Sequence, residues 1–141
     1  MSTESEVREP NPGDFTESLI VAVAPSVVLA ALTTAAGVSS WWGPSVARDN
    51  GLEVRFPVSD DPLVLRLSQS GNSVYWTVEE CSFLPEWVGT TPTFALSTHD
   101  DGSTVIEFRH TGLTPQLDCY DKCSTDWSYF LTRRFRASLQ P

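Results

Sequence analysis

GSTVIEFRHTGL, residues 102–113, and DKCSTDWSYFLTRRFRASL, residues 121–139, are the stretches that decide the fold of this chain. The first alternates as a β-strand does, which places Ile106, Phe108 and His110 on one face of a sheet. The second has apolar residues spaced as in an amphipathic helix, and its stripe consists of Cys123, Trp127, Phe130, Leu131 and Phe135. An apolar sheet face opposite such a stripe encloses either a packed core or a ligand cavity, and that choice decides the function.

Length and composition predict a single globular domain. The chain has 141 residues and a mass of 15.5 kDa, with 40% hydrophobic and 19% charged residues, which suits one domain with one core. Residues 1–14 are rich in Ser, Glu and Pro, so we expect a flexible tail rather than a signal peptide, a domain over 15–141 and a cytoplasmic protein. The longest apolar run, residues 19–32, is interrupted by Pro25, so no membrane insertion is expected.

The charge distribution argues against a nucleic-acid partner. The net charge is −9 and Lys122 is the single lysine, whereas phosphate binding needs clustered Lys and Arg. Arg133, Arg134 and Arg136 lie near the end of the predicted C-terminal helix, where cations complement the helix dipole. A site for an anionic partner is the alternative interpretation of these three arginines.

The cysteines and histidines do not form a metal-binding pattern. Cys119 and Cys123 stand four apart without a second pair, Cys81 is distant in sequence, and His99 lies in a turn-like segment. We therefore expect no metal and no cofactor, and mostly buried free thiols. A redox role of Cys119 and Cys123 is the alternative, and it requires a lowered thiol pKa.

The remaining pattern predicts an α+β protein. A strand begins at Phe15, two short helices follow over 26–32 and 35–40, and turn signals then separate several alternating strand-like runs. Pro92 falls inside one of these runs and is expected at a bulge or a sheet edge, because proline has no N–H to donate. We predict a curved antiparallel sheet of about seven strands wrapped around a long C-terminal helix, with two short helices after the first strand.

A series of short motifs along the chain resembles a known family. The motifs are residues 23–28 at the start of the first helix, the pair Trp41 and Trp42, residues 86–90 before a strand containing 94–96, residues 102–113, and the helix with Trp127. In this order they resemble the helix-grip proteins of the START-like superfamily, also called birch-pollen-allergen-like or polyketide-cyclase-like. Within it, the chain is similar to the family named after the C-terminal domain of the activator of the heat-shock chaperone ATPase. The resemblance covers nearly the whole ordered chain.

This resemblance implies a deep cavity between sheet and C-terminal helix that binds a hydrophobic or amphipathic small molecule. The superfamily includes lipid carriers, aromatase/cyclases and the chaperone co-activator domain, so the fold alone does not identify a reaction. The first hypothesis is ligand binding with little or no catalysis, by a monomer or homodimer. The second is a cyclase- or hydrolase-type enzyme. The third, a chaperone-associated interaction module, is the weakest, because the chain shows no additional domain for docking.

Nine residues are the candidate ligand contacts of this cavity. They are Trp41, Phe56, Trp76, Phe94, Phe108, His110, Trp127, Leu131 and Arg134. The aromatic members are either core residues or cavity walls, because both environments use the same residue types. Trp41 and Trp42 cannot both point inward, so one should face the pocket and the other should pack on the sheet.

His110 is the candidate for catalysis, since an imidazole titrates near working pH and can act as a general acid or base. The alternative, a structural histidine, is favoured because no carboxylate partner can be assigned to orient it. In the enzyme hypothesis Tyr75 or Arg134 supplies a second donor. Arg134 follows Trp127 by seven residues, and it either points inward toward a ligand carboxylate or lies at the rim with its stem over apolar surface.

Overall fold

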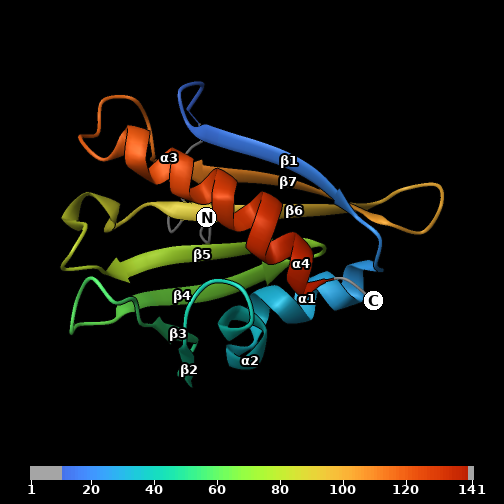
Figure 1. The fold of residues 1–141 in the computed structure, drawn as a ribbon, viewed down its shortest axis with the longest axis horizontal. Helices are drawn as coiled ribbons and strands as arrows, with labels where there is room; N and C mark the ends of the chain where they lie inside the picture. The colour runs from blue at the N-terminus through green and yellow to red at the C-terminus, as the bar shows by residue number, and fades with distance from the viewer. Residues whose placement is uncertain (1–10, 140–141) are drawn as a thin grey trace.

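The computed structural model describes residues 11–139 and shows one curved sheet crossed by a C-terminal helix (Figure 1). The strands are β1 (Phe15–Val21), β2 (Ser45–Arg48), β3 (Gly51–Val54), β4 (Leu63–Ser70), β5 (Ser73–Glu80), β6 (Thr91–Thr98) and β7 (Thr104–Thr111). The helices are α1 (Pro25–Thr33), α2 (Ala35–Ser39), the 3-10 turn η2 (Pro85–Trp87), α3 (Tyr120–Tyr129), the π-helical turn η3 (Phe130–Phe135) and α4 (Arg136–Ser138). The sheet order is β1-β7-β6-β5-β4-β3-β2, antiparallel throughout. The predicted α+β class and seven-stranded sheet are confirmed.

The first and last strands lie side by side at one edge of the sheet. Phe15 on β1 is opposite His110 on β7, and Val21 is opposite Thr104. The helices α1 and α2 then carry the chain to β2 at the other edge, as predicted from the helix signals after the first strand. The strands from β2 to β7 then form a meander, with tight turns after β2 and β4 and longer loops over 55–62 and 81–90.

The C-terminal helix lies against the sheet through a buried stripe at four-residue intervals, formed by Cys123, Trp127, Leu131 and Phe135. In a regular α-helix each such step overshoots one turn by about 40°, so the stripe would drift away from the sheet. The π-helical turn η3 has wider i→i+5 bonding and therefore less rotation per residue. It brings Leu131 and Phe135 back over the apolar face, where both are fully buried.

A carboxylate anchors the beginning of the domain to the end of β7. The side chain of Asp14 is completely buried. Its Oδ2 accepts hydrogen bonds from Arg109 Nη1 at 3.1 Å and from the Asn11 backbone N–H at 2.9 Å, and its Oδ1 accepts from Gly112 N–H at 3.0 Å. Gly112 has a φ of 102°, a left-handed conformation that glycine adopts at low cost. Asn11 to Asp14 thus form a hydrogen-bonded turn that is tied to Gly112 just after β7.

The structure bears on the expectations for the N-terminal tail and for Pro92. Residues 1–10 of the expected tail lie outside the described residues, while Asn11 to Asp14 form the hydrogen-bonded turn just described. The expectation that Pro92 sits at a bulge or an edge is wrong, because β6 is an interior strand. Pro92 pairs with His110 on β7, and the regular β5–β6 pairing stops at Thr93, the residue that follows Pro92, because the proline nitrogen has no hydrogen for β5. Within residues 11–139, every helix is too short or too polar to cross a membrane.

Replacing Asp14 by alanine should destabilise the fold. The change leaves Gly112 N–H and the Arg109 guanidinium without their buried acceptor, which costs about 1–3 kcal/mol. Urea unfolding measures the loss. Asp100→Ala is the control: Asp100 is exposed, and its removal should change stability by less than about 0.5 kcal/mol. Equal stability of the two variants would contradict the anchoring role.

Candidate functional site

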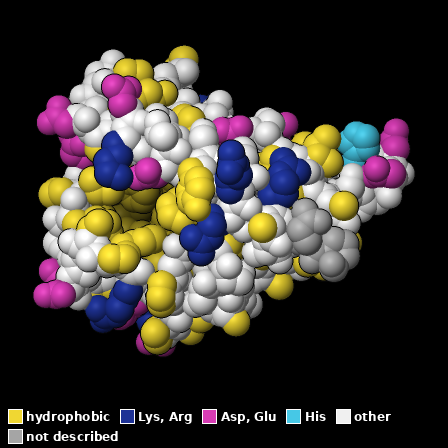
Figure 2. All heavy atoms as spheres, in the orientation of Figure 1, with side chains coloured by type: hydrophobic (Ala, Val, Ile, Leu, Met, Phe, Trp, Pro, Cys, Tyr) yellow, Lys and Arg dark blue, Asp and Glu magenta, His cyan; other side chains and the backbone are white. Residues whose placement is uncertain are grey.

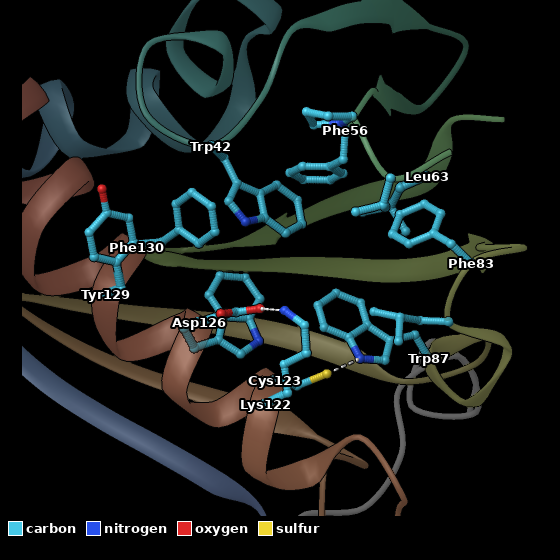
Figure 3. A pocket seen from close by; sticks show the side chains of 14 residues that line it. Trp42, Phe56, Leu63, Phe83, Trp87, Lys122, Cys123, Asp126, Tyr129 and Phe130 are labelled. Atoms are coloured by element: carbon cyan, nitrogen blue, oxygen red, sulfur yellow. Dashed lines mark hydrogen bonds and ion pairs between the residues drawn. The ribbon is translucent and has the colours of Figure 1, made fainter. Parts of the chain in front are cut away.

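A pocket of about 580 Å³ opens between the first half of the C-terminal helix and the loops at one end of the sheet. Figure 2 shows it as a hollow lined with hydrophobic side chains, and Figure 3 shows the lining residues. The loops and strands contribute Trp42, Phe56, Pro57, Val58, Leu63, Phe83, Leu84 and Trp87, and the helix contributes Lys122, Cys123, Asp126, Trp127, Tyr129 and Phe130. Most of the lining is apolar, which is typical of small-molecule sites.

Three nearly parallel indoles form one wall of the pocket. Trp42 and Trp127 stack with ring centroids 5.2 Å apart and an interplanar angle of 15°. Trp87 and Trp127 stack at 6.0 Å and 7°. The opposite side carries Phe56, which contacts Trp42 edge-on at 5.1 Å, and Phe83, which contacts Phe56 edge-on at 6.0 Å. The wall is therefore built of nearly parallel rings and is rich in π-surface.

A buried hydrogen-bond chain holds this wall from behind. Trp127 Nε1 donates to His110 Nδ1 at 2.9 Å. His110 Nε2 lies 2.8 Å from Thr90 Oγ1, and the Thr90 hydroxyl donates to the Trp87 carbonyl at 2.6 Å. Because the hydroxyl hydrogen is used by that carbonyl, His110 donates from Nε2 and accepts at Nδ1, as the neutral Nε2–H tautomer. These hydrogen bonds link α3, β7 and η2 through Thr90, the residue before β6.

His110 is therefore placed as a structural histidine. It is 0% exposed, both ring nitrogens have protein partners, and it does not line the pocket. A general acid or base must reach the proton that it transfers, directly or through one water. This geometry supports the structural interpretation over the catalytic one.

The polar groups of the helix side of the pocket are largely paired with one another. Lys122 Nζ and Asp126 Oδ2 form an exposed ion pair at 2.7 Å, one helical turn apart. Trp87 Nε1 donates to Cys123 Sγ at 3.3 Å (Figure 3). These pairs present little net charge to the cavity.

Two of the three thiols, Cys119 and Cys81, are poor nucleophiles. Burial, followed by the hydrogen bond with Cys123, raises the pKa of Cys119 to about 12 from its ordinary value of 9.0. Burial also raises the pKa of Cys81. Since the thiolate is the reactive form, Cys119 lacks the lowered pKa that the redox alternative requires.

The structure distributes the nine candidate contacts between the pocket and the core. Phe56 and Trp127 line the pocket. Arg134 is exposed on the helix and lies outside the lining. The members that are fully buried in the packed interior, away from the pocket, are Trp41, Trp76, Phe94, Phe108, His110 and Leu131. Of the tryptophan pair it is Trp42 that faces the pocket, while Trp41 packs between Trp42, Trp76 and Phe135.

Several lining residues were missed by sequence reasoning. Phe83 and Leu84 stand before Pro85 in a segment that reads as a turn, and Phe130 belongs to the helix stripe without having been assigned to a cavity. Two adjacent large apolar residues in a turn were the available signal, because a turn offers them no core of its own.

The chain was compared with known proteins by sequence and by structure. No sequence family and no curated protein matches it. Solved structures do: the Aha1 dimer from Colwellia psychrerythraea has a TM-score of 0.73 and 22% identity, over 89% of this chain and 96% of that one. A START superfamily protein from Mycobacterium smegmatis has a TM-score of 0.64 and 10% identity, over 89% and 96%. DynU16, a putative protein in the dynemicin biosynthetic locus, has a TM-score of 0.63 and 15% identity, over 89% of this chain and 47% of that one. At these identities the likeness shows the fold, and the predicted helix-grip fold is confirmed.

Replacing His110 by alanine should destabilise the protein by about 3 kcal/mol or more. The change leaves Trp127 Nε1–H unpaired in the core and opens a cavity next to it. Urea unfolding gives the value, and His99→Ala is the matched control, because the His99 side chain is 50% exposed. A stability of His110→Ala within about 0.5 kcal/mol of that control would contradict the structural role.

Cys119 should resist alkylation in the folded protein. At pH 8 its reaction with iodoacetamide should be at least about 100-fold slower than in urea, because the raised pKa keeps the thiol protonated. Since the folded pKa lies above the unfolded one, this thiol's contribution to stability is present below pH 9 and is lost as the pH rises toward 12. Peptide mapping by mass spectrometry follows the reaction, and equal rates with and without urea would refute the assignment.

Proposed function

We propose that this protein binds a flat, mainly apolar small molecule in the pocket between the C-terminal helix and the sheet-end loops. The observation that carries the proposal is the open cavity of about 580 Å³ with an aromatic lining. Its volume falls within the range of roughly 300–1,000 Å³ that is usual for small-molecule sites. A cavity lined by tryptophan and phenylalanine side chains gains stability when an apolar ligand displaces its water.

The shape of the wall favours a planar ligand. Trp42, Trp127 and Trp87 are nearly parallel, so a flat molecule that stacks on one of these indoles is parallel to the other two, whereas a branched molecule makes less ring contact. The charge of the site favours a neutral ligand. Lys122 is already paired with Asp126, and the whole chain carries a net charge of −9, which repels anions.

Binding is a better interpretation of this pocket than catalysis. Among the described lining residues there is no histidine, and the carboxylate of Asp126 is paired with Lys122. The buried His110 is engaged on both nitrogens, and burial raises the pKa of Cys119. A nucleophile beside an oriented base, the arrangement that acyl or glycosyl transfer uses, is therefore missing from the described lining.

Self-association is a second element of the proposal. One structurally similar protein, from Colwellia psychrerythraea, is an Aha1 dimer. On that likeness we retain the homodimer beside the monomer, and a chaperone partner as the less favoured alternative. Sedimentation of the purified protein at several concentrations distinguishes monomer from dimer.

The most direct test is to denature the freshly purified protein and to analyse the released small molecules by mass spectrometry. A stoichiometric apolar aromatic compound supports the proposal. Release of a stoichiometric highly charged metabolite instead would contradict it.

A charge at the pocket mouth should weaken ligand binding without unfolding the protein. Val58→Asp should raise the Kd for the neutral fluorescent probe N-phenyl-1-naphthylamine at least about threefold, because an apolar rim contact becomes an ion that must be desolvated. Val46→Asp is the matched control. Both valines are exposed, at 72% and 61%, and only Val58 lines the pocket. Equal Kd values for the two variants, or no binding by the wild type, would count against the pocket.

A further inference from the structure

Four of the five tryptophans donate their indole N–H to a protein acceptor. Trp41 donates to the Ala31 carbonyl at 3.1 Å and Trp76 to the Leu32 carbonyl at 3.0 Å. Trp87 donates to Cys123 Sγ, and Trp127 donates to His110 Nδ1. Within the part of the chain that the structure describes, Trp42 is the exception, and its Nε1–H has no acceptor.

The unpaired N–H of Trp42 is not sealed inside the core. Trp42 is 6% exposed. Among the described residues, a single side-chain N or O atom is both fully buried and without a hydrogen-bond partner, and it is Thr91 Oγ1 rather than Trp42 Nε1. Trp42 Nε1 therefore touches open space, and the space that Trp42 borders is the pocket. In Figure 3 the Trp42 indole reaches from its backbone into the ring of lining side chains.

We propose that Trp42 Nε1 is the specificity-determining donor of the pocket, and that it hydrogen-bonds an acceptor on the bound molecule. This inference rests on the proposed function and deepens it: the ligand class is a flat apolar molecule bearing a neutral acceptor such as a carbonyl or an ether oxygen. A donor in an apolar wall loses much of its hydration, and an acceptor on the ligand restores the lost bond.

The neighbouring groups make Trp42 the site at which an acceptor is recognised. The other two indoles of the wall, Trp87 and Trp127, already use their N–H groups within the protein. The ammonium of Lys122 is held by Asp126 at 2.7 Å. An anionic acceptor would bring a charge into an apolar cavity whose described lining offers no unpaired cation to balance it, so a neutral acceptor fits better.

A pair of nearly isosteric probes isolates this hydrogen bond. 2-Acetylnaphthalene carries a carbonyl acceptor, and 2-isopropylnaphthalene has a methyl group in its place. The wild-type protein should bind the ketone about 5- to 10-fold more tightly, as measured by displacement of N-phenyl-1-naphthylamine. Equal affinity for the two compounds overturns the inference and leaves the proposed function standing. Binding of neither compound nor the fluorescent probe overturns both.

Trp42→Phe should abolish the preference for the ketone, because phenylalanine keeps an aromatic ring without the N–H. The readout is the ratio of the two affinities, which cancels the effect of the smaller ring on packing. Trp87→Phe is the matched control: it removes an indole of the same wall whose N–H is already bonded to Cys123, so the preference should persist. Persistence of the preference in Trp42→Phe contradicts the assignment.

A measurement on the wild-type protein covers the case in which Trp42→Phe fails to fold. Labelling tryptophan with ¹⁵N gives five indole signals, and that of Trp42 can be assigned by its contact with Phe56, whose ring lies 5.1 Å away. Without ligand, the Trp42 N–H should exchange with D₂O faster than the other four. Added 2-acetylnaphthalene should shift its proton downfield, and 2-isopropylnaphthalene should not. A Trp42 signal that exchanges as slowly as the buried indoles, or that ignores the ketone, overturns the inference.

Discussion

A buried hydrogen-bond chain from Trp127 through His110 and Thr90 to the carbonyl of Trp87 fixes the C-terminal helix to the sheet. It joins segments that are distant in the sequence, and in an apolar core such bonds are directional and costly to leave unmade. Apolar packing alone tolerates small rotations of a helix against a sheet, whereas these directional hydrogen bonds specify a single orientation of the helix. The indoles of Trp127 and Trp87 are also pocket walls, so the contacts that orient the helix shape the cavity.

The C-terminal helix packs closely on the sheet at its C-terminal end, and the cavity opens near its N-terminal end. Beyond Trp127 the π-helical turn returns the apolar stripe to the sheet, and the Phe135 ring lies 4.5 Å from that of Trp41 between centroids. Near the start of the helix the facing side chains include Phe56 and Phe83, which come from loops and leave space between themselves and α3. A site built in this way combines a wall fixed by the sheet with a wall that loops supply, a common arrangement for binding sites.

Periodicity explains why the fold could be predicted and the site only in part. The alternation around Phe108 and the helical spacing around Trp127 are local signals, and they correctly predicted the strand, the helix and their facing apolar surfaces. Which part of that interface stays open depends on the helix path, and the π-helical turn that sets this path has no local sequence signal. For this reason Trp41 and Trp76 were assigned to the cavity with Phe56, although the structure packs both tryptophans in the core. The structural interpretation of His110 rested on the missing carboxylate, whereas the structure gives it an indole and a hydroxyl as partners.

The hydrogen-bond partner of each tryptophan N–H distinguishes core residues from pocket residues, whereas residue type does not. Tryptophan side chains occur on both sides of the division, and burial is nearly complete for all of them. What differs is the partner of the indole N–H: core tryptophans such as Trp41 donate to backbone carbonyls, and the wall residues Trp87 and Trp127 donate to side chains that fix their orientation. Trp42 is packed as tightly as these and yet keeps its donor open toward the cavity. A fold that satisfies the other indoles so consistently leaves this one for a partner that arrives from outside, and a site with an unpaired donor in its wall discriminates more sharply between ligands than an entirely apolar one.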